Sequence, residues 1–438
     1  MNRSVLSLLA IAGVLTVSCA PTRSADLDPR VAQREPVVES SYVLPDYEIT
    51  HRFDYSDNCR VTGRKSVIPA GRRHIAVFAS CRDGRYSKSH ILIYDLDEAA
   101  LSADYNISEL PFPRFSVGTV PSIDARDRIL GAGIAGLKQN QSLDYLDRLA
   151  AGAIVMSPKS EGVANSYSII DLGFEFGPVI GLYPWWLTAS RNTDLAFVQL
   201  AYAPIINGER ADNHVSENHL YRITSTGLEY LRVLNPASGP VPGEPFCPVG
   251  NGANCTVTNL VDMPNGNAIL FNRQFYDGEV DLSVISRVRL SENGDIEWLA
   301  HQVYELLEVR PYIPPILSGE HVVILTAGSS STTYRLVSLD VETLSQTGGA
   351  LPHNSLPFGF THPLRGLANS PSENVVFNYS ALHGLEARRA SDLAVLGRYP
   401  PTGVFSPDRV SRIATGRHPG EVVVYGFDET LVLDFGAN

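Results

Sequence analysis

Short apolar runs recur in pairs along most of this chain. In the clearest pair, residues 75–79 are followed by a polar loop and then by residues 91–96. Each run is rich in Val, Ile, Leu, Phe and Tyr and is bounded by Gly, Asn, Asp or Ser, which is typical of strands joined by hairpins. Further pairs are 153–156 with 167–171, 195–200 with 220–223, 268–271 with 282–288, 321–325 with 334–340, 375–379 with 385–392, and 421–425 with 430–434.

Repetition of such units at intervals of roughly 40 to 75 residues indicates a β-propeller. We therefore predict an all-β fold, most simply seven blades of about four antiparallel strands each. Weakly apolar stretches at 123–132, 185–189, 256–261 and 413–416 are the expected innermost strands. Six or eight blades are alternatives within this fold. A sandwich or two separate β domains would also repeat short strands.

One early segment has no partner run of its own. Residues 47–53 alternate with period two, as a half-buried strand does. A ring of sheets must join its first and last members, because an open ring leaves exposed strand edges. We predict that residues 47–53 form the outer strand of the blade completed by residues 430–435.

An aspartate closes many of the second runs. A carboxylate at this place accepts hydrogen bonds from backbone N–H groups of the turn, so its recurrence needs no catalytic explanation. The residues concerned are Asp95, Asp171, Asp340, Asp392 and Asp434.

Composition agrees with a large globular β domain. Of the 438 residues, 44% are hydrophobic and 19% are charged, and 35 Gly with 29 Pro suit a fold with many turns. The formal net charge is −12, and no run of basic residues interrupts it. Nucleic-acid binding depends on clustered Lys and Arg, so this balance argues against a nucleic-acid partner.

The N-terminus has the pattern of a secretory signal. Arg3 precedes an apolar stretch at 5–17, which is too short to span a bilayer and ends in small residues before Cys19. Residues 15–19 resemble the lipobox of bacterial lipoproteins. This resemblance implies cleavage before Cys19, acyl chains on its thiol and commonly on its amino group, and stable attachment to a membrane. An ordinary signal peptide that releases a soluble protein is the alternative.

The resulting organisation has three parts. Residues 1–18 form the signal peptide, 19–46 the lipidated cysteine with a flexible tether, and 47–438 the propeller domain. Flexible-coil statistics give the tether a reach of about 25 to 30 Å. In proteobacterial lipoproteins an Asp after the lipidated cysteine commonly retains the protein in the inner membrane. Ala20 stands at that position, so the resemblance implies the outer membrane, with the domain in the periplasm or at the surface.

Four cysteines remain in what is expected to be an oxidising compartment. Proximity favours disulfides between Cys59 and Cys81 and between Cys247 and Cys255, although four cysteines allow three pairings. Free buried thiols are the alternative. A metal site is less favoured because the chain contains no Cys-x-x-Cys pair.

Three groups of side chains are candidates for binding. Tyr183, Trp185 and Trp186 lie where an inner strand is expected, and one of them would stack on a sugar or a partner side chain if it faced the funnel. His214, Glu217 and His219 lie in the polar stretch 212–219, where a folded loop would hold a metal ion. Core packing explains the aromatic group equally well, and a solvated hairpin loop explains the second. His353, His362 and His418 lie in connections near prolines.

The pattern contains no local catalytic motif and implies no cofactor apart from the lipid on Cys19. We expect a non-catalytic lipoprotein of the cell envelope, whose rigid ring presents loops to another envelope protein. The alternative is an enzyme or binding protein that acts on a glycan or another polymer at the propeller funnel. Because propeller catalytic residues come from separate blades, the absence of a local motif leaves this alternative open.

Overall fold

The computed structural model describes most of the region expected to be the domain. The described residues are 42–61, 71–106, 122–135, 150–156, 167–171, 179–206, 209–210, 215–225, 227–234, 254–275, 281–305, 308–309, 313–327, 334–350 and 364–436. Cys19 and the predicted signal peptide lie outside these ranges. Within them, no helix has the length and hydropathy of a membrane span.

Hydrogen bonds group the described strands into six sheets. The β2–β5 sheet contains β2 (Cys59–Arg60), β3 (His74–Asp83), β4 (Tyr86–Asp95) and β5 (Ala100–Asn106). The β6–β9 sheet contains β6 (Ser122–Ile123), β7 (Ile129–Ala135), β8 (Ala150–Met156) and β9 (Tyr167–Asp171). The β10–β14 sheet contains β10 (Val179–Ala189), β11 (Leu195–Ile206), β12 (Glu209–Arg210), β13 (Val215–Ile223) and β14 (Leu228–Val233).

Two further sheets follow along the chain. The β15–β18 sheet contains β15 (Asn254–Asp262), β16 (Asn267–Phe275), β17 (Asp281–Leu290) and β18 (Ile296–Glu305). The β19–β23 sheet contains β19 (Glu308–Val309), β20 (Ile316–Ser318), β21 (His321–Ala327), β22 (Tyr334–Asp340) and β23 (Gln346–Ala350).

The last sheet has eight strands and two antiparallel halves. The β24–β27 half contains β24 (Leu364–Asn369), β25 (Val375–Ser380), β26 (Gly384–Arg389) and β27 (Val395–Tyr399). The closing half contains β28 (Val410–Thr415), β29 (Glu421–Gly426), β30 (Glu429–Asp434) and β1 (Glu48–Asp54). A single parallel pair, Gly366 with Ile413, joins the halves. The predicted number of seven blades depends on counting these halves separately.

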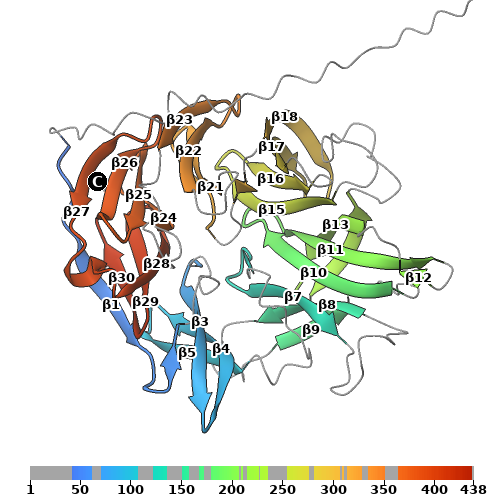
Figure 1. Ribbon diagram of the computed structural model, residues 1–438, viewed down its shortest axis with the longest axis horizontal. Helices are drawn as coiled ribbons and strands as arrows, with labels where there is room; N and C mark the ends of the chain where they lie inside the picture. Colours follow the sequence, from blue (N-terminus) through green and yellow to red (C-terminus); the bar gives the residue numbers. More distant parts are fainter. Residues whose placement is uncertain are drawn as a thin grey trace, which may run out of the picture.

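The sheets stand around a common centre (Figure 1), and this ring confirms the all-β propeller prediction. Strand β1 pairs antiparallel with β30, from Glu48 opposite Asp434 to Asp54 opposite Glu429. The predicted closure of the last sheet by the N-terminal strand is therefore confirmed. In this way the ring avoids an open edge at the point where its two ends meet.

The core lies between neighbouring sheets, and this explains the continuous apolar runs. Along β3, Ile75 and Val77 pack toward the closing half. The alternate residues Ala76 and Phe78 pack toward the β6–β9 sheet. Because successive side chains of a strand point to opposite faces, a strand buried on both faces must be apolar at consecutive positions.

The predicted turn role of the recurrent aspartates is confirmed at four of them. Asp95 Oδ1 accepts hydrogen bonds from the N–H groups of Asp97 at 2.9 Å and Glu98 at 3.2 Å. Asp340 Oδ1 accepts them from Glu342 at 3.0 Å and Thr343 at 2.7 Å. Asp392 Oδ1 accepts a hydrogen bond from the N–H of Ala394 at 3.1 Å, and Asp434 Oδ1 accepts one from Gly436 at 2.8 Å. These bonds fix the backbone of each turn.

Two predictions about strands were wrong in detail. Residues 123–132 are not one inner strand: β6 ends at Ile123, and β7 begins at Ile129 after a turn in which Asp124 Oδ1 accepts the N–H groups of Arg126 and Arg128. The pair 153–156 and 167–171 therefore forms the third and fourth strands of its sheet, whereas the other pairs form the second and third. The sequence did not predict this turn because residues 124–128 contain neither glycine nor proline, the residues that most clearly mark turns.

Candidate functional site

The inner strands surround a cavity of about 380 Å³. Its wall is formed by the ends of β6, β10, β15, β20, β24 and β28, together with the turns that follow several of them. We call this end of the ring the turn end. A volume of this size falls within the range of small-ligand pockets. The cavity is therefore the first place to look for a functional site.

About half of the residues that line the cavity are aliphatic or proline, and most of the others carry hydroxyl, amide or charged side chains. Among the described lining residues, the charged side chains are Arg191, Asp262 and Arg417, and His418 lies beside Arg417. Asn259 also borders the cavity, and its Nδ2 has no hydrogen-bond partner among the described residues. The wall therefore offers both apolar surface and several polar contacts to a small ligand.

Asp262 is the only carboxylate among the described lining residues, and it accepts hydrogen bonds from the turn that follows β10. Its Oδ1 accepts a hydrogen bond from Ser190 Oγ at 2.6 Å, and its Oδ2 accepts one from the N–H of Arg191 at 2.6 Å. Burial raises the pKa of Asp262 above its usual value, although these hydrogen bonds and the Arg191 charge oppose that shift. The carboxylate thus joins the β10–β14 and β15–β18 sheets.

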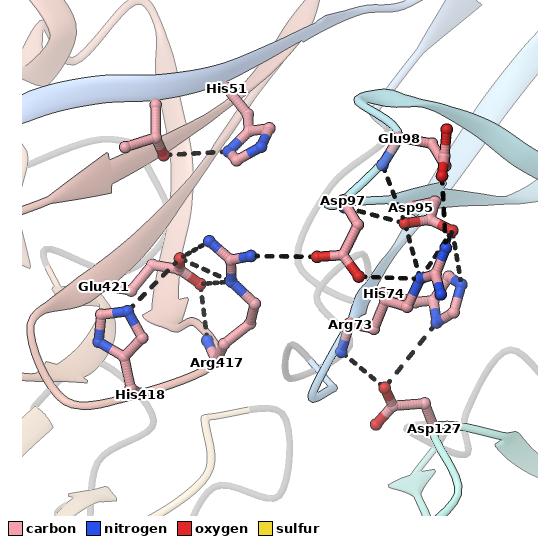
Figure 2. Close-up of polar contacts among 11 residues, drawn as sticks. His51, Arg73, His74, Asp95, Asp97, Glu98, Asp127, Arg417, His418 and Glu421 are labelled. Atoms are coloured by element: carbon pink, nitrogen blue, oxygen red, sulfur yellow. Dashed lines mark hydrogen bonds and ion pairs between the residues drawn. The ribbon is translucent and has the colours of Figure 1, made fainter.

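The same arrangement recurs between the β2–β5 and β6–β9 sheets. Asp127, in the turn after β6, accepts hydrogen bonds from the N–H groups of Arg72 at 2.6 Å and Arg73 at 2.7 Å. His74 lies between two carboxylates, with Nε2 3.5 Å from Asp95 and Nδ1 3.8 Å from Asp127 (Figure 2). Burial raises the pKa of Asp127, but the proximity of His74 and the hydrogen bonds from the Arg72 and Arg73 N–H groups outweigh it, and the net shift is downward.

An ion-pair chain crosses the seam where the ring closes (Figure 2). Arg417 Nη2 lies 2.6 Å from Glu421 Oε2, and Arg417 Nη1 lies 3.6 Å from Asp97 Oδ1. Asp97 Oδ2 lies 3.2 Å from Arg73 Nε, and Arg73 Nη2 lies 2.7 Å from Asp95 Oδ2. Charges of alternating sign thus connect the closing half with the β2–β5 sheet.

These pairs favour the charged forms of the groups they link. The hydrogen bond with Glu421 is the main cause that raises the pKa of Arg417. Burial raises the pKa of Asp95, but the hydrogen bonds from Arg73 and from the turn N–H groups outweigh it and the net shift is downward. Asp95 is therefore stabilised as a hydrogen-bond-accepting carboxylate. Such a group serves as a fixed anchor and is a poor proton donor.

The predicted aromatic group lies in β10. Tyr183 pairs with Ala201 and Trp186 with Gln199 in the β10–β11 ladder, and Trp185 lies between them at a register shift. This placement on an innermost strand agrees with the sequence expectation. The structure describes only their backbone, so their predicted role in ligand or partner binding stays a prediction.

Two residues of the predicted metal group, Glu217 and His219, lie in a strand and not in a loop. Strand β13 begins at Val215, and its polar residues pair with β11, with Glu217 opposite Leu200 and His219 opposite Val198. The loop interpretation of 215–219 was wrong because pairing with a long neighbouring strand overrides local polarity. His219 Nε2 lies 3.0 Å from Glu217 Oε2, whereas His214 lies outside the described residues.

The described ranges contain no group of three or more His, Cys, Asp or Glu side chains placed to hold a metal ion. His418 borders the cavity, but His353 and His362 lie outside the described residues. The predicted metal site at His214, Glu217 and His219 stays a prediction. The role of His353, His362 and His418 in binding also stays a prediction.

The structure contains one of the two expected disulfides. Cys59 and Cys81 are joined with an S–S distance of 2.01 Å, between paired positions of β2 and β3. Cys247 lies outside the described residues, and Cys255 is described only as a backbone position of β15.

Comparison with known proteins concerns the fold. No protein-family model and no curated protein matches the chain. RRP9 WD40 repeats superpose with a TM-score of 0.43 at 10% identity, covering 89% of this chain and 99% of that one. The β-propeller domain of Cps50 (Swd1) from Myceliophteria thermophila gives 0.42 at 11% identity, covering 86% and 99%. Chaetomium thermophilum Sqt1, bound to the N-terminus of ribosomal protein L10, gives 0.40 at 11%, covering 86% and 99%.

Proposed function

We propose that this protein is a non-catalytic interaction platform of the cell envelope, attached to a membrane by acyl chains on Cys19. The observation that supports a platform is the state of the carboxylates at the turn end. Asp262, Asp127, Asp95 and Glu421 each accept hydrogen bonds from an arginine side chain, a hydroxyl or backbone N–H groups. Asp262 and Asp127 connect neighbouring sheets, while Asp95 and Glu421 fix the positions of Arg73 and Arg417 in the ion-pair chain. A fixed surface loses little entropy when a partner binds.

The geometry gives less support to polymer hydrolysis. Glycoside hydrolysis ordinarily uses two carboxylates that flank the bond to be cleaved, one of them as a proton donor. Asp262 is the only carboxylate in the described wall of the cavity, and it already accepts hydrogen bonds from Ser190 and Arg191. We therefore assign the cavity no catalytic step.

Lipid attachment would place this ring close to a membrane. The support for it is the lipobox-like stretch ending at Cys19. Residues 42–46, the last five of the predicted tether, already lie on the ring. Tyr42 and Leu44 pack against the core between the closing and β24–β27 halves, and Tyr399 Oη donates a hydrogen bond to the Pro45 carbonyl. The free tether would then extend from Ala20 to about Ser41.

Attachment is tested by fractionating cells that express wild type, Cys19→Ser or Ala20→Asp. We expect wild type in the outer membrane, Cys19→Ser in the soluble fraction and Ala20→Asp in the inner membrane. Thr22→Ala, a substitution close to the cysteine that leaves the lipobox-like stretch intact, is the matched control and should fractionate as wild type. Retention of Cys19→Ser in the membrane would refute the anchor.

The platform itself is tested by crosslinking in intact cells with an amine-reactive reagent, followed by purification of the lipidated protein. We expect a discrete crosslinked product of higher mass that recurs between preparations and is depleted for the released Cys19→Ser form. Recovery of monomer alone, at reagent concentrations that crosslink a known envelope complex in the same cells, would contradict the proposal.

A further inference from the structure

The hairpin formed by β3 and β4 extends beyond its neighbouring strands. The two strands pair from His74 opposite Asp95 to Asp83 opposite Tyr86. Strand β5 pairs only with the part of β4 from His90 onward, and β2 pairs only with Ser80 and Cys81. Among the described strands, the outer part of the hairpin therefore has no third partner, and Figure 1 shows it projecting from the rim of the ring.

The projecting part carries an aromatic ring and cations. Tyr86 is 77% exposed, the highest value for a described aromatic side chain. Arg82 and Arg85 are also exposed, and neither side chain forms an ion pair or hydrogen bond with the described residues. The chain has a net charge of −12. Two exposed arginines without an ion-pair partner among the described residues, next to an exposed tyrosine, therefore differ from the acidic character of the chain as a whole.

The disulfide lies at the base of this projection. Cys81 is the last β3 residue that pairs with β2, and its bond to Cys59 fixes the hairpin to the chain that follows β1. Directly beyond it, the N–H of Arg82 donates a hydrogen bond to the Asn58 carbonyl at 2.6 Å. A two-stranded hairpin alone is only marginally stable in water, so this brace holds the tip in one conformation before it meets a partner.

We propose that the tip of the β3–β4 hairpin is the contact element of the platform and binds an acidic surface of a partner protein through Tyr86, Arg82 and Arg85. This inference rests on the proposed function. Tyrosine and arginine are enriched among the residues that carry most binding energy at protein interfaces. The arginines are suited to pair with carboxylates, because the guanidinium binds them through two parallel hydrogen bonds.

A membrane surface fits the tip less well. Recognition of anionic lipids typically uses clusters of about four to eight basic residues. Here the described tip has two exposed arginines, and Lys88 is half-buried and already has an interaction partner. An acidic protein surface therefore matches the number and spacing of the charges better.

The test places a photoreactive phenylalanine analogue at Ser87, in the tip, or at Leu382, an exposed residue in the corresponding turn between β25 and β26. After irradiation of intact cells, we expect an adduct with one partner protein from Ser87 only. In the Arg82→Glu/Arg85→Glu background the adduct yield should fall at least tenfold. The control Arg289→Glu, at an exposed arginine of β17, should leave the yield unchanged, with a small fall in Tm because the introduced carboxylate faces Glu297.

The outcomes separate the two proposals. Suppose that amine-reactive crosslinking captures a partner. If the Ser87 adduct is then missing, has the same yield as the Leu382 adduct, or keeps its yield after charge reversal, the hairpin is not the contact element. The platform proposal is unaffected by that result. If neither method yields a partner, both proposals fail. If the Cys19→Ser protein binds vesicles of equal parts phosphatidylglycerol and phosphatidylcholine, and charge reversal at Arg82 and Arg85 abolishes this, the tip recognises lipid and the inference is wrong.

Discussion

The Arg417 guanidinium lies 3.6 Å from the Asp97 carboxylate, across the seam where the last sheet of the ring meets the first. The pairing of β1 with β30 closes the ring within the last sheet, next to this seam. Ring closure therefore has two components: a backbone ladder on the outside and an ion-pair chain at the turn end. The two can be perturbed independently.

The Glu421→Gln substitution should weaken the ion-pair component. The Glu421 side chain is only 1% exposed, and it accepts three hydrogen bonds from the Arg417 side chain and one from its N–H. Removing the charge leaves Arg417 without its main partner, so we expect a loss of about 2 to 4 kcal/mol in urea unfolding. The control Glu297→Gln removes an exposed partner of Arg289 and should cost less than about 1 kcal/mol. Equal losses would contradict the structural role of Glu421.

Removal of strand β1 tests the backbone component. A protein that begins at Tyr42 keeps β1, and we expect it to unfold cooperatively like the longer chain. A protein that begins at Tyr55 exposes the free edge of β30 and lacks Phe53, which is buried at the seam. Because an open edge pairs with other chains, we expect this shorter protein to self-associate in analytical ultracentrifugation and to lose a sharp thermal transition. A monomeric, cooperative product would show that closure is dispensable.

The fold was predictable because burial on both faces leaves a direct record in the sequence. Ile75 and Ala76 pack on opposite sides of one strand, and so the chain must be apolar at both. The closing strand was predictable for the related reason that residues 47–53 alternate and have no partner run. Local composition was misleading where pairing overrode it, as at Glu217 in β13.

The turn-end contacts were not predictable in the same way. Asp95 was correctly expected to cap its own turn, but its pairing with Arg73 depends on how that turn lies in the sheet. Arg417 and Asp97 meet only because the ring closes, and no spacing along the chain records such a contact. The recurring aspartate at strand ends was the one sequence signal for these contacts. It indicated where the turns lie, but not which side chains each aspartate contacts.

Reduction of the Cys59–Cys81 disulfide should destabilise the protein. The bond closes a loop with a sequence separation of 22, for which the chain-entropy model gives roughly 3 kcal/mol. We expect dithiothreitol to lower the Tm of wild type and to change the Tm of the Cys59→Ser/Cys81→Ser variant less. Before reduction, the Tm of this variant should already be below that of wild type. That variant is the control for any other disulfide. Equal shifts in the two proteins would show that this bond contributes little.

The pH dependence of stability should distinguish the buried carboxylate of Glu386 from the half-buried carboxylate of Asp262. Burial raises the pKa of Glu386, but the Arg388 charge, hydrogen bonds from Arg388 and Asn378, and the Arg398 charge outweigh it, so the net shift is downward. A carboxyl with a lowered folded-state pKa stabilises the fold above its unfolded value, about 4.3 for Glu, and loses that contribution as the pH falls through the folded value. For Asp262 the pKa shift is upward, so its charge costs stability at neutral pH and protonation removes the cost.

The measurement is urea unfolding from about pH 7 to about pH 3. At neutral pH the unfolding free energy of wild type should exceed that of Glu386→Gln by about 3 to 5 kcal/mol, and this difference should shrink as the pH falls. Wild type should gain relative to Asp262→Asn over the same interval. Parallel curves for the two variants would contradict the opposite shifts.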